Sequence, residues 1–179
     1  MPTFLSLKQK PDHMNKISKA IALSLMLLSV SSLPGCYAQT GETTANKTHS
    51  ELPLSEAGLK QVRLNIRTAE KTHAFVVEVA ENAAQQSQGL MFRTELAPDK
   101  GMIFPFPNDR VASFWMKNTV IPLDIIFIRR DGTIESIAAD TIPYSLDSVV
   151  SNEPVATVLE IAAGRASELG IEPGDQVSW

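Results

Sequence analysis

Residues Gly89 to Phe127 read GLMFRTELAPDKGMIFPFPNDRVASFWMKNTVIPLDIIF. Methionine, phenylalanine and tryptophan are frequent in this stretch, while Arg93, Lys117 and Asp124 stand among apolar neighbours. Burying a charged side chain without a partner is costly. Each of these three residues therefore needs an oppositely charged partner, a ligand or contact with solvent. The stretch also contains the short apolar runs that predict the central strands of the fold.

Segments before and within this stretch have the composition of β-strands. Gln61–Arg67 alternates strictly between polar and apolar residues, which is typical of a strand with one buried face. Ala74–Val79 is rich in β-branched residues, and Met102–Phe104 and Ala112–Lys117 are short apolar runs. Between them, Glu81–Gln88 favours a helix that ends at the following glycine, since glycine readily adopts the left-handed conformation found at helix ends.

The C-terminal third predicts a hairpin, a strand, a short helix and a last strand. Asp124–Arg130 and Thr133–Ala138 flank Asp131-Gly132, a dipeptide typical of tight β-hairpins. Because Ile125 to Ile128 is apolar on both faces, we expect this strand to be central and covered on each side. The remaining elements are a strand at Val158–Ile161, a helix at Gly164–Leu169 capped by Gly170, a turn at Pro173-Gly174 and a strand at Gln176–Trp179.

Together these elements predict a mainly β (α+β) fold, a compact barrel-like domain of short strands with one or two short helices. The chain has 179 residues, which suits one such domain and a leader. We place the domain at residues 59–179.

The N-terminal residues 1–35 are expected to be a signal peptide. Lys16 and Lys19 precede an apolar run, Ala20–Val30, and small residues follow, as in secretory signals. The run is too short to span a bilayer comfortably. Met14 is a possible start, because the residues before it add nothing that a signal requires.

Cys36 is the only cysteine of the chain. The segment Leu33-Pro34-Gly35-Cys36 resembles the lipobox of bacterial lipoproteins, in which the cysteine is lipidated and becomes the mature N-terminus, although Pro34 is atypical. The alternative is cleavage after Ala38, which gives a soluble periplasmic protein. We favour lipidation, because a lone exported cysteine otherwise has no role here.

Tyr37 rather than aspartate follows the cysteine, which resembles the outer-membrane sorting pattern. The expected product is an outer-membrane lipoprotein that faces the periplasm, with the membrane as its partner through the anchor at Cys36. Residues 36–58 are rich in Thr, Ser, Gly, Asn and Glu and are expected to form a flexible tether.

Charge argues against nucleic acid as a partner. Removing residues 1–35 leaves 12 basic and 19 acidic residues, a net charge near −7. Neutralisation of phosphates by basic residues dominates the affinity of proteins for nucleic acids. A chain this acidic, without a basic stripe, is therefore a poor nucleic-acid binder.

Several motifs resemble the DUF192 family, also called UPF0127, over about Asn65 to Val177. They are Gly89-Leu90-Met91-Phe92-Arg93, Gly101-Met102-Ile103-Phe104, Phe114-Trp115-Met116-Lys117-Asn118-Thr119, Ile121-Pro122-Leu123-Asp124 and Val158-Leu159-Glu160. Two departures are small: Pro105 is expected to interrupt the strand after Phe104, and Thr157 stands where a bulkier residue is often found. The resemblance implies the fold class, and it implies no activity, since the family has none that is settled.

The sequence contains few side chains in arrangements that suit catalysis. No Gly-x-Ser-x-Gly elbow and no plausible serine triad is present. An enzyme would need carboxylates, either Asp124 with Glu160 or Asp109, because two carboxyls in different environments can act as acid and base. A hydrolase-like enzyme of small molecules that uses Asp124 and Glu160, with Arg93 orienting the substrate, is the alternative function. We assign no catalytic residue.

No cofactor and no metal site is predicted. His73 is the one histidine of the predicted domain, and we expect it at the solvated edge of a strand. Met91, Met102 and Met116 carry thioethers that suit Cu(I). Each lies next to Phe, Leu or Trp, so packing in the core is the preferred interpretation.

The sequence contains more side chains that suit the binding of a ligand. The candidate ligand-binding residues are Arg93, Trp115, Lys117, Asn118, Asp124 and Glu160. Arg93 and Lys117 can hold a carboxylate or phosphate, while Trp115 can stack on a sugar ring. The alternative is structural: Arg93 pairs with Asp124 or Glu160, Trp115 fills the core, and Asn118 and Asp124 bind backbone groups of a turn. The predicted function is a noncatalytic cell-envelope binding or accessory module, with the ligand and the oligomeric state left open.

Overall fold

The structure is a computed structural model that describes residues 51–179. The predicted signal peptide, Cys36 and the tether up to residue 50 lie outside the described residues. Residues 51–179 form nine strands and two short helices, and neither helix is long and apolar enough to cross a membrane. The strands are β1 (Gln61–Arg67), β2 (Thr72–Val79), β3 (Lys100–Arg110), β4 (Ser113–Phe114), β5 (Leu123–Ile128), β6 (Ile134–Ala138), β7 (Val149–Val150), β8 (Val155–Ala162) and β9 (Gln176–Ser178), and the helices are α1 (Ala83–Gln88) and α2 (Arg165–Leu169).

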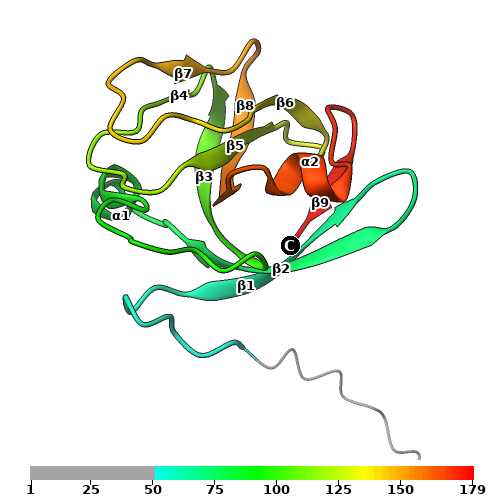
Figure 1. Cartoon of the computed structure of the whole chain (residues 1–179). Helices are drawn as coiled ribbons and strands as arrows, with labels where there is room; N and C mark the ends of the chain where they lie inside the picture. The colour runs from blue at the N-terminus through cyan, green and yellow to red at the C-terminus, as the bar shows by residue number, and fades with distance from the viewer. Residues whose placement is uncertain (1–50) are drawn as a thin grey trace, which may run out of the picture. The chain divides into compact units, whose positions relative to one another are not determined.

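Seven strands form one curled sheet in the order β6-β5-β8-β3-β2-β1-β9, and β4 and β7 form a separate two-stranded sheet (Figure 1). Neighbouring strands are antiparallel except β2 and β3, which run parallel. A bridge between Thr133 and Gln176 links the two edges of the large sheet. The predicted β-rich, barrel-like domain is confirmed.

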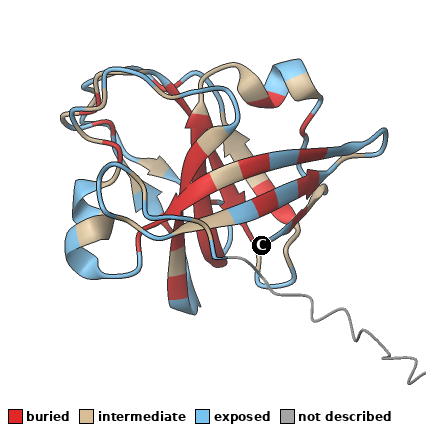
Figure 2. Ribbon diagram, turned by 90° about the horizontal axis from the view of Figure 1, so that it is seen from below, coloured by how far each residue is buried: buried red, intermediate tan, exposed pale blue. Residues whose placement is uncertain are grey.

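Two apolar clusters lie on the two faces of the central strands β3, β8 and β5. The first is closed by α2 and includes Ile103, Leu159 and Ile161. The second lies beneath the segment after α1 and the β4–β7 sheet, and includes Phe104 and Phe127. Buried residues run along these strands in Figure 2, whereas the tip of the β1–β2 hairpin is exposed. The central strands are therefore covered on both sides, as the apolar run at Ile125 to Ile128 predicts.

The hairpin prediction is confirmed by β5 and β6, which pair across the Asp131-Gly132 turn. Both predicted helices are present, and α2 ends at Gly170 in the left-handed conformation. The prediction that Pro105 interrupts a short strand is wrong, because β3 continues to Arg110 and its register against β8 shifts only after Pro105. The strand expected at Ala112–Lys117 is reduced to the two residues of β4.

Candidate functional site

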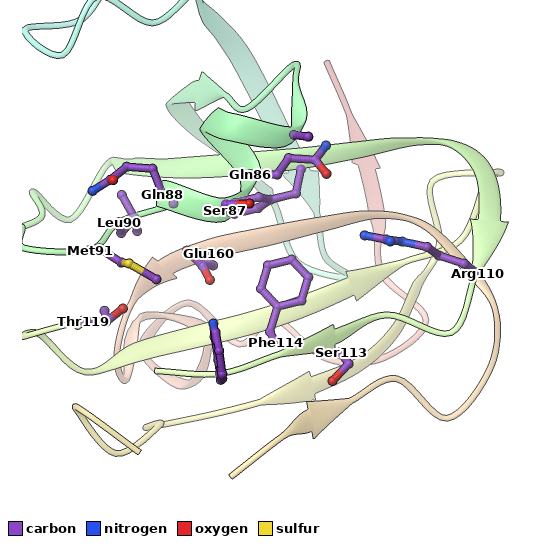
Figure 3. Close-up of a pocket in the computed structure, with 14 residues that line it drawn as sticks. Gln86, Ser87, Gln88, Leu90, Met91, Arg110, Ser113, Phe114, Thr119 and Glu160 are labelled. Carbon is purple, nitrogen blue, oxygen red and sulfur yellow. The ribbon is translucent and has the colours of Figure 1, made fainter. Parts of the chain in front are cut away.

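A cavity of about 350 Å³ lies between α1, β4 and the face of the large sheet that carries the second apolar cluster (Figure 3). Its walls come from α1 and the residues after it, from the end of β3, and from β4 and the segment that follows. The lining residues are Ala83, Gln86, Ser87, Gln88, Gly89, Leu90, Met91, Phe104, Arg110, Ser113, Phe114, Trp115, Thr119 and Glu160. A cavity of this size suits a small ligand of roughly one sugar ring or one side chain.

Glu160 forms the floor of this cavity. It lies on β8 directly opposite Met102 of β3 and Ile125 of β5, so its side chain emerges among the apolar residues of the second cluster. The residue is only 5% exposed, and within residues 51–179 no hydrogen bond or salt bridge reaches its carboxyl group. Burial raises the pKa of Glu160 to about 8, because the charged carboxylate loses its hydration there. The cavity therefore contains a carboxyl group that is largely protonated at neutral pH and free to bind a ligand.

Aromatic rings stand beside this carboxyl group. The rings of Phe104 and Phe114 meet edge to face with their centroids 5.0 Å apart, a favourable arrangement for aromatic pairs. Phe104 is buried, whereas Trp115 is 49% exposed at the mouth. The structural alternative, in which Trp115 fills the core, is therefore wrong, and the position of Trp115 on the cavity wall leaves its ring open to contact with a ligand.

The polar part of the wall comes from α1. Asn82 begins this helix with a capping box in which its side chain and that of Gln85 bind each other's backbone N–H groups. Gln86 fixes the helix to the sheet, because its side-chain amide donates to the carbonyl oxygens of Ala80 and Pro105 at 3.1 and 3.0 Å. Helix α1 thus presents the side-chain amides of Gln86 and Gln88 and the hydroxyl group of Ser87 to the cavity from a fixed position.

Arg110 is the other charged residue of the cavity lining. Its guanidinium lies over the ring of Phe106, 3.9 Å from the centroid, an arrangement that a cation–π attraction favours. In Figure 3 it lies beyond the ring of Phe114 as seen from Glu160. The guanidinium of Arg110 is therefore held against Phe106 and not against the carboxyl group of Glu160.

The loops at the mouth hold non-glycine residues at positive φ. Phe92 has a φ of 63°, Asn118 of 57° and Tyr144 of 63°. The backbone N–H of Phe92 donates to the carbonyl of Asn118 at 2.9 Å, and that of Tyr144 donates to Thr119 at 3.1 Å. Such conformations cost about 1–3 kcal/mol each and gather at binding and catalytic sites. Their position next to Met91 and Thr119 agrees with a functional cavity.

The DUF192 family model, described as "Uncharacterized ACR", matches residues 64–179. The chain belongs to the DUF192 family. The resemblance that the sequence motifs predict is thereby confirmed, and the match covers nearly all of the described residues.

Two solved structures are similar to this DUF192 protein. One, from Sinorhizobium meliloti, bears the description "putative transcription regulator"; it is 45% identical, with a TM-score of 0.66, over 67% of this chain and 94% of that chain. The other, a protein of unknown function from Novosphingobium aromaticivorans, is 42% identical, with a TM-score of 0.71, over 78% of this chain and 99% of that chain. A search of curated proteins finds no match.

Asp124 of the DUF192 domain does not reach the cavity. It lies opposite Ile161, one residue from Glu160, so the two carboxyl groups point to opposite faces of the sheet. Asp124 is fully buried and accepts backbone N–H groups of Asp140 at 2.9 Å, Gly164 at 3.0 Å and Ala166 at 2.9 Å. The carboxylate pair of the alternative enzyme is therefore not formed, and Asp124 fixes the start of α2. It binds backbone N–H groups, as the structural interpretation expects, but these groups belong to Asp140, Gly164 and Ala166 and not to the turn that Asp124 ends.

Arg93 is paired elsewhere. Its guanidinium lies 2.6 Å from the carboxylate of Glu78 on β2. The structural alternative expected a salt bridge of Arg93, but with Asp124 or Glu160, and that choice of partner is wrong. This pair lies in a wider depression of about 570 Å³. The buried acid of that depression, Glu78, already has its partner, whereas Glu160 has none, so we take the cavity above Glu160 as the candidate site.

Of the six candidate ligand-binding residues, the structure brings together Trp115 and Glu160. Lys117 is exposed, with its ammonium 5.1 Å from the centre of the Trp115 ring, and Asn118 donates to the sulfur of Met91 at 3.8 Å. Neither lines the cavity. Sequence reasoning missed Gln86, Gln88, Phe104, Arg110 and Phe114. The glutamine-rich run of α1 is a signal for the two glutamines, and Phe104 and Phe114 stand in the family motifs.

The other candidate groups have ordinary positions. Asp109 pairs with Arg130 at the surface. The expectation of a solvated His73 is wrong, because the residue is buried and its Nε2 has no hydrogen-bond partner within residues 51–179. Met102 and Met116 belong to the second apolar cluster, as the packing interpretation predicts. In the same residues no group of three or more His, Cys, Asp or Glu side chains is placed to hold a metal ion.

Proposed function

We propose that this DUF192 protein is a noncatalytic binding module of the cell envelope whose cavity takes a small saccharide-like ligand. One observation carries the proposal: the buried carboxyl group of Glu160 has no protein partner in the described part of the chain and faces a cavity. Buried polar groups normally have a hydrogen-bond partner. Burial of the Glu160 carboxyl group without a partner lowers the free energy of unfolding. A ligand that binds this group would explain why it is present.

The wall chemistry supports a sugar-like ligand. Trp115 and Phe114 offer flat apolar surfaces on which the C–H face of a sugar ring can stack. Gln88, Ser87 and Thr119 add donors and acceptors that suit hydroxyl groups. Apolar walls with a few directed polar groups are typical of small-molecule sites.

The same geometry supports binding rather than hydrolysis. Glycosidic hydrolysis generally uses two carboxyl groups on either side of the bond to be cleaved. Glu160 has no such partner among the lining residues, since Asp124 lies on the opposite face of the sheet. A single carboxyl group suffices for recognition.

A thermal-shift screen of the purified protein against envelope saccharides tests the proposal, because a ligand that binds only the folded state raises its melting temperature. Ser87→Phe fills the cavity from α1, and Ala84→Phe adds the same bulk to that helix outside the cavity. We expect at least one saccharide to raise the melting temperature of the wild type and of Ala84→Phe, but not of Ser87→Phe. No shift with any saccharide, or equal shifts in all three proteins, contradicts the proposal.

Export and lipid anchoring are part of the proposal and rest on the sequence. The lipobox-like segment at Cys36 and the apolar run before it support them. Labelling cells with a palmitate analogue tests the anchor. The wild type should incorporate the label and Cys36→Ala should not, whereas equal labelling of both rules the anchor out.

A further inference from the structure

We infer that the ligand carries an ammonium group and that Glu160 receives it, so that the cavity selects aminated saccharides over neutral ones. This inference rests on the proposed function and names the ligand class of the same cavity. It concerns the one buried acidic group of the lining.

The surroundings of Glu160 favour a cation over a neutral donor. No backbone N–H and no side-chain donor within residues 51–179 binds the carboxyl group, in contrast to Asp124, which accepts three N–H groups. Phe104, Phe114 and Trp115 line the same cavity. Aromatic faces attract cations through their quadrupole, and recognition of ammonium groups commonly uses such rings. A carboxylate beside aromatic rings therefore offers an ammonium both a charge partner and an apolar wall.

The other charges near the cavity are compatible with a cation at this position. Arg110 is the one cation of the lining; its guanidinium lies over the ring of Phe106, and the Phe114 ring separates it from Glu160 in Figure 3. Arg93 is bound to Glu78, and Lys117 lies over Trp115 outside the lining. The Glu160 end of the cavity thus has no positive charge of its own.

Proton release distinguishes an ammonium from a neutral sugar. Burial raises the pKa of Glu160 to about 8, so the empty cavity holds a protonated carboxyl group at neutral pH. An ammonium stabilises the carboxylate, which lowers the pKa of Glu160 and releases its proton to solvent. A neutral sugar hydrogen-bonds to the protonated carboxyl group and releases no proton.

Glucosamine and glucose form the matched pair for the test, since they differ in an ammonium and a hydroxyl group at one carbon. Titration calorimetry of the purified protein at about pH 6.5, in two buffers with different heats of ionisation, gives both the affinity and the protons released. We expect glucosamine to bind at least about tenfold more tightly than glucose and to release close to one proton. Glu160→Gln should abolish the preference and the proton release, whereas the exposed control Glu95→Gln should keep both.

Equal affinities for the two sugars, or a preference that persists in Glu160→Gln, overturn the inference and leave the proposed function standing. Binding of neither sugar up to about 10 mM, a range that covers weak small ligands, also overturns the inference. If other saccharides still protect the protein in the thermal screen, the proposed function survives; if none does, both fail.

Discussion

At the scale of single residues, Glu160 and Asp124 illustrate how one sheet gives two carboxyl groups opposite roles. They lie on adjacent strands, one position out of register, and both are buried. Asp124 is surrounded by backbone N–H groups, which stabilise its charge. Glu160 is surrounded by apolar side chains, and the loss of hydration raises its pKa. Only the second is available to a ligand.

Replacing Glu160 by glutamine should stabilise the protein at neutral and alkaline pH. The folded state raises the pKa of Glu160 from 4.5 to about 8, so between these values the folded state holds a proton that the unfolded state has lost. The contribution of Glu160 to the free energy of unfolding is therefore full below about pH 4.5 and falls by up to about 1.4 kcal/mol per pH unit until about pH 8. Urea denaturation at several pH values should show this slope in the wild type and a flatter profile in Glu160→Gln.

The exposed Glu95 provides the control, because Glu95→Gln changes the same chemical group without altering a buried carboxyl. Its profile should follow that of the wild type. A Glu160→Gln profile parallel to the wild type over this range speaks against a buried, unpaired carboxyl group.

Replacing Asp124 by asparagine tests the structural role. The amide nitrogen cannot accept the N–H groups of α2, so we expect the free energy of unfolding to fall by about 3 kcal/mol. The affinity of the folded protein for a cavity ligand should not change. The surface acid Asp109, paired with Arg130, serves as a comparison, since Asp109→Asn should cost less than about 1 kcal/mol. If Asp124→Asn also lowers the free energy of unfolding by less than about 1 kcal/mol, Asp124 does not fix the start of α2.

The sequence could not separate these two acids. Composition and spacing identify Asp124, Glu160 and Trp115 as unusual, but the face on which each lies depends on the register between β5 and β8. A shift of one residue exchanges the faces of a strand, and periodicity within one strand does not give its register against another. For the same reason the partner of Arg93, Glu78 on β2, could not be chosen among the acids of the chain.

At the scale of elements, patterns formed by residues close together in the sequence predict individual strands and turns correctly. The alternation in β1 and the Asp131-Gly132 turn both give the observed strands. A strand around β4 is predicted, but β7 and its pairing with β4 are not, because each strand has two residues and they pair over a long separation in the chain. That sheet carries Phe114, so a wall of the cavity follows from contacts that local patterns do not contain.

The helix α1 acts as a support for polar side chains and not as part of the core, since none of its residues is buried. Its capping box fixes the start, and the two bonds from Gln86 fix its distance from the sheet. A helix of six residues is too short to be stable alone. Its position therefore depends on these side-chain bonds, which hold one wall of the cavity in place.

At the scale of the described domain, closure of the large sheet depends on the contact between β9 and the β5–β6 turn. Val177 donates to the carbonyl of Gly132 at 2.8 Å, and Gln176 donates to the hydroxyl of Thr133 at 2.7 Å. β9 also pairs with β1. One short strand thus links the two edges of the sheet and brings Val177 into the first apolar cluster.

Gly132→Ala should weaken this closure. A Cβ atom at Gly132 would lie 2.5 Å from the carbonyl oxygen of Val177, whereas one at Gly174 would meet nothing within 4 Å. Both glycines have positive φ, so both substitutions carry a backbone strain of roughly 1–2 kcal/mol. In Gly132→Ala the clash lowers the free energy of unfolding by a further amount of about 1–3 kcal/mol. The difference between Gly132→Ala and Gly174→Ala in the free energy of unfolding measures this contribution. Equal losses would show that the turn does not depend on the close approach of β9.

The central claim is that Glu160 is a buried carboxyl group without a protein partner, open to a ligand. Titration of its δ-carbon signal by nuclear magnetic resonance, assigned by its absence in Glu160→Gln, measures this most directly. The structure predicts a midpoint at about pH 8 that moves to lower pH when glucosamine is added and not when glucose is added. A midpoint near the ordinary value of 4.5 would mean that the group is hydrated or already paired, and would contradict the account.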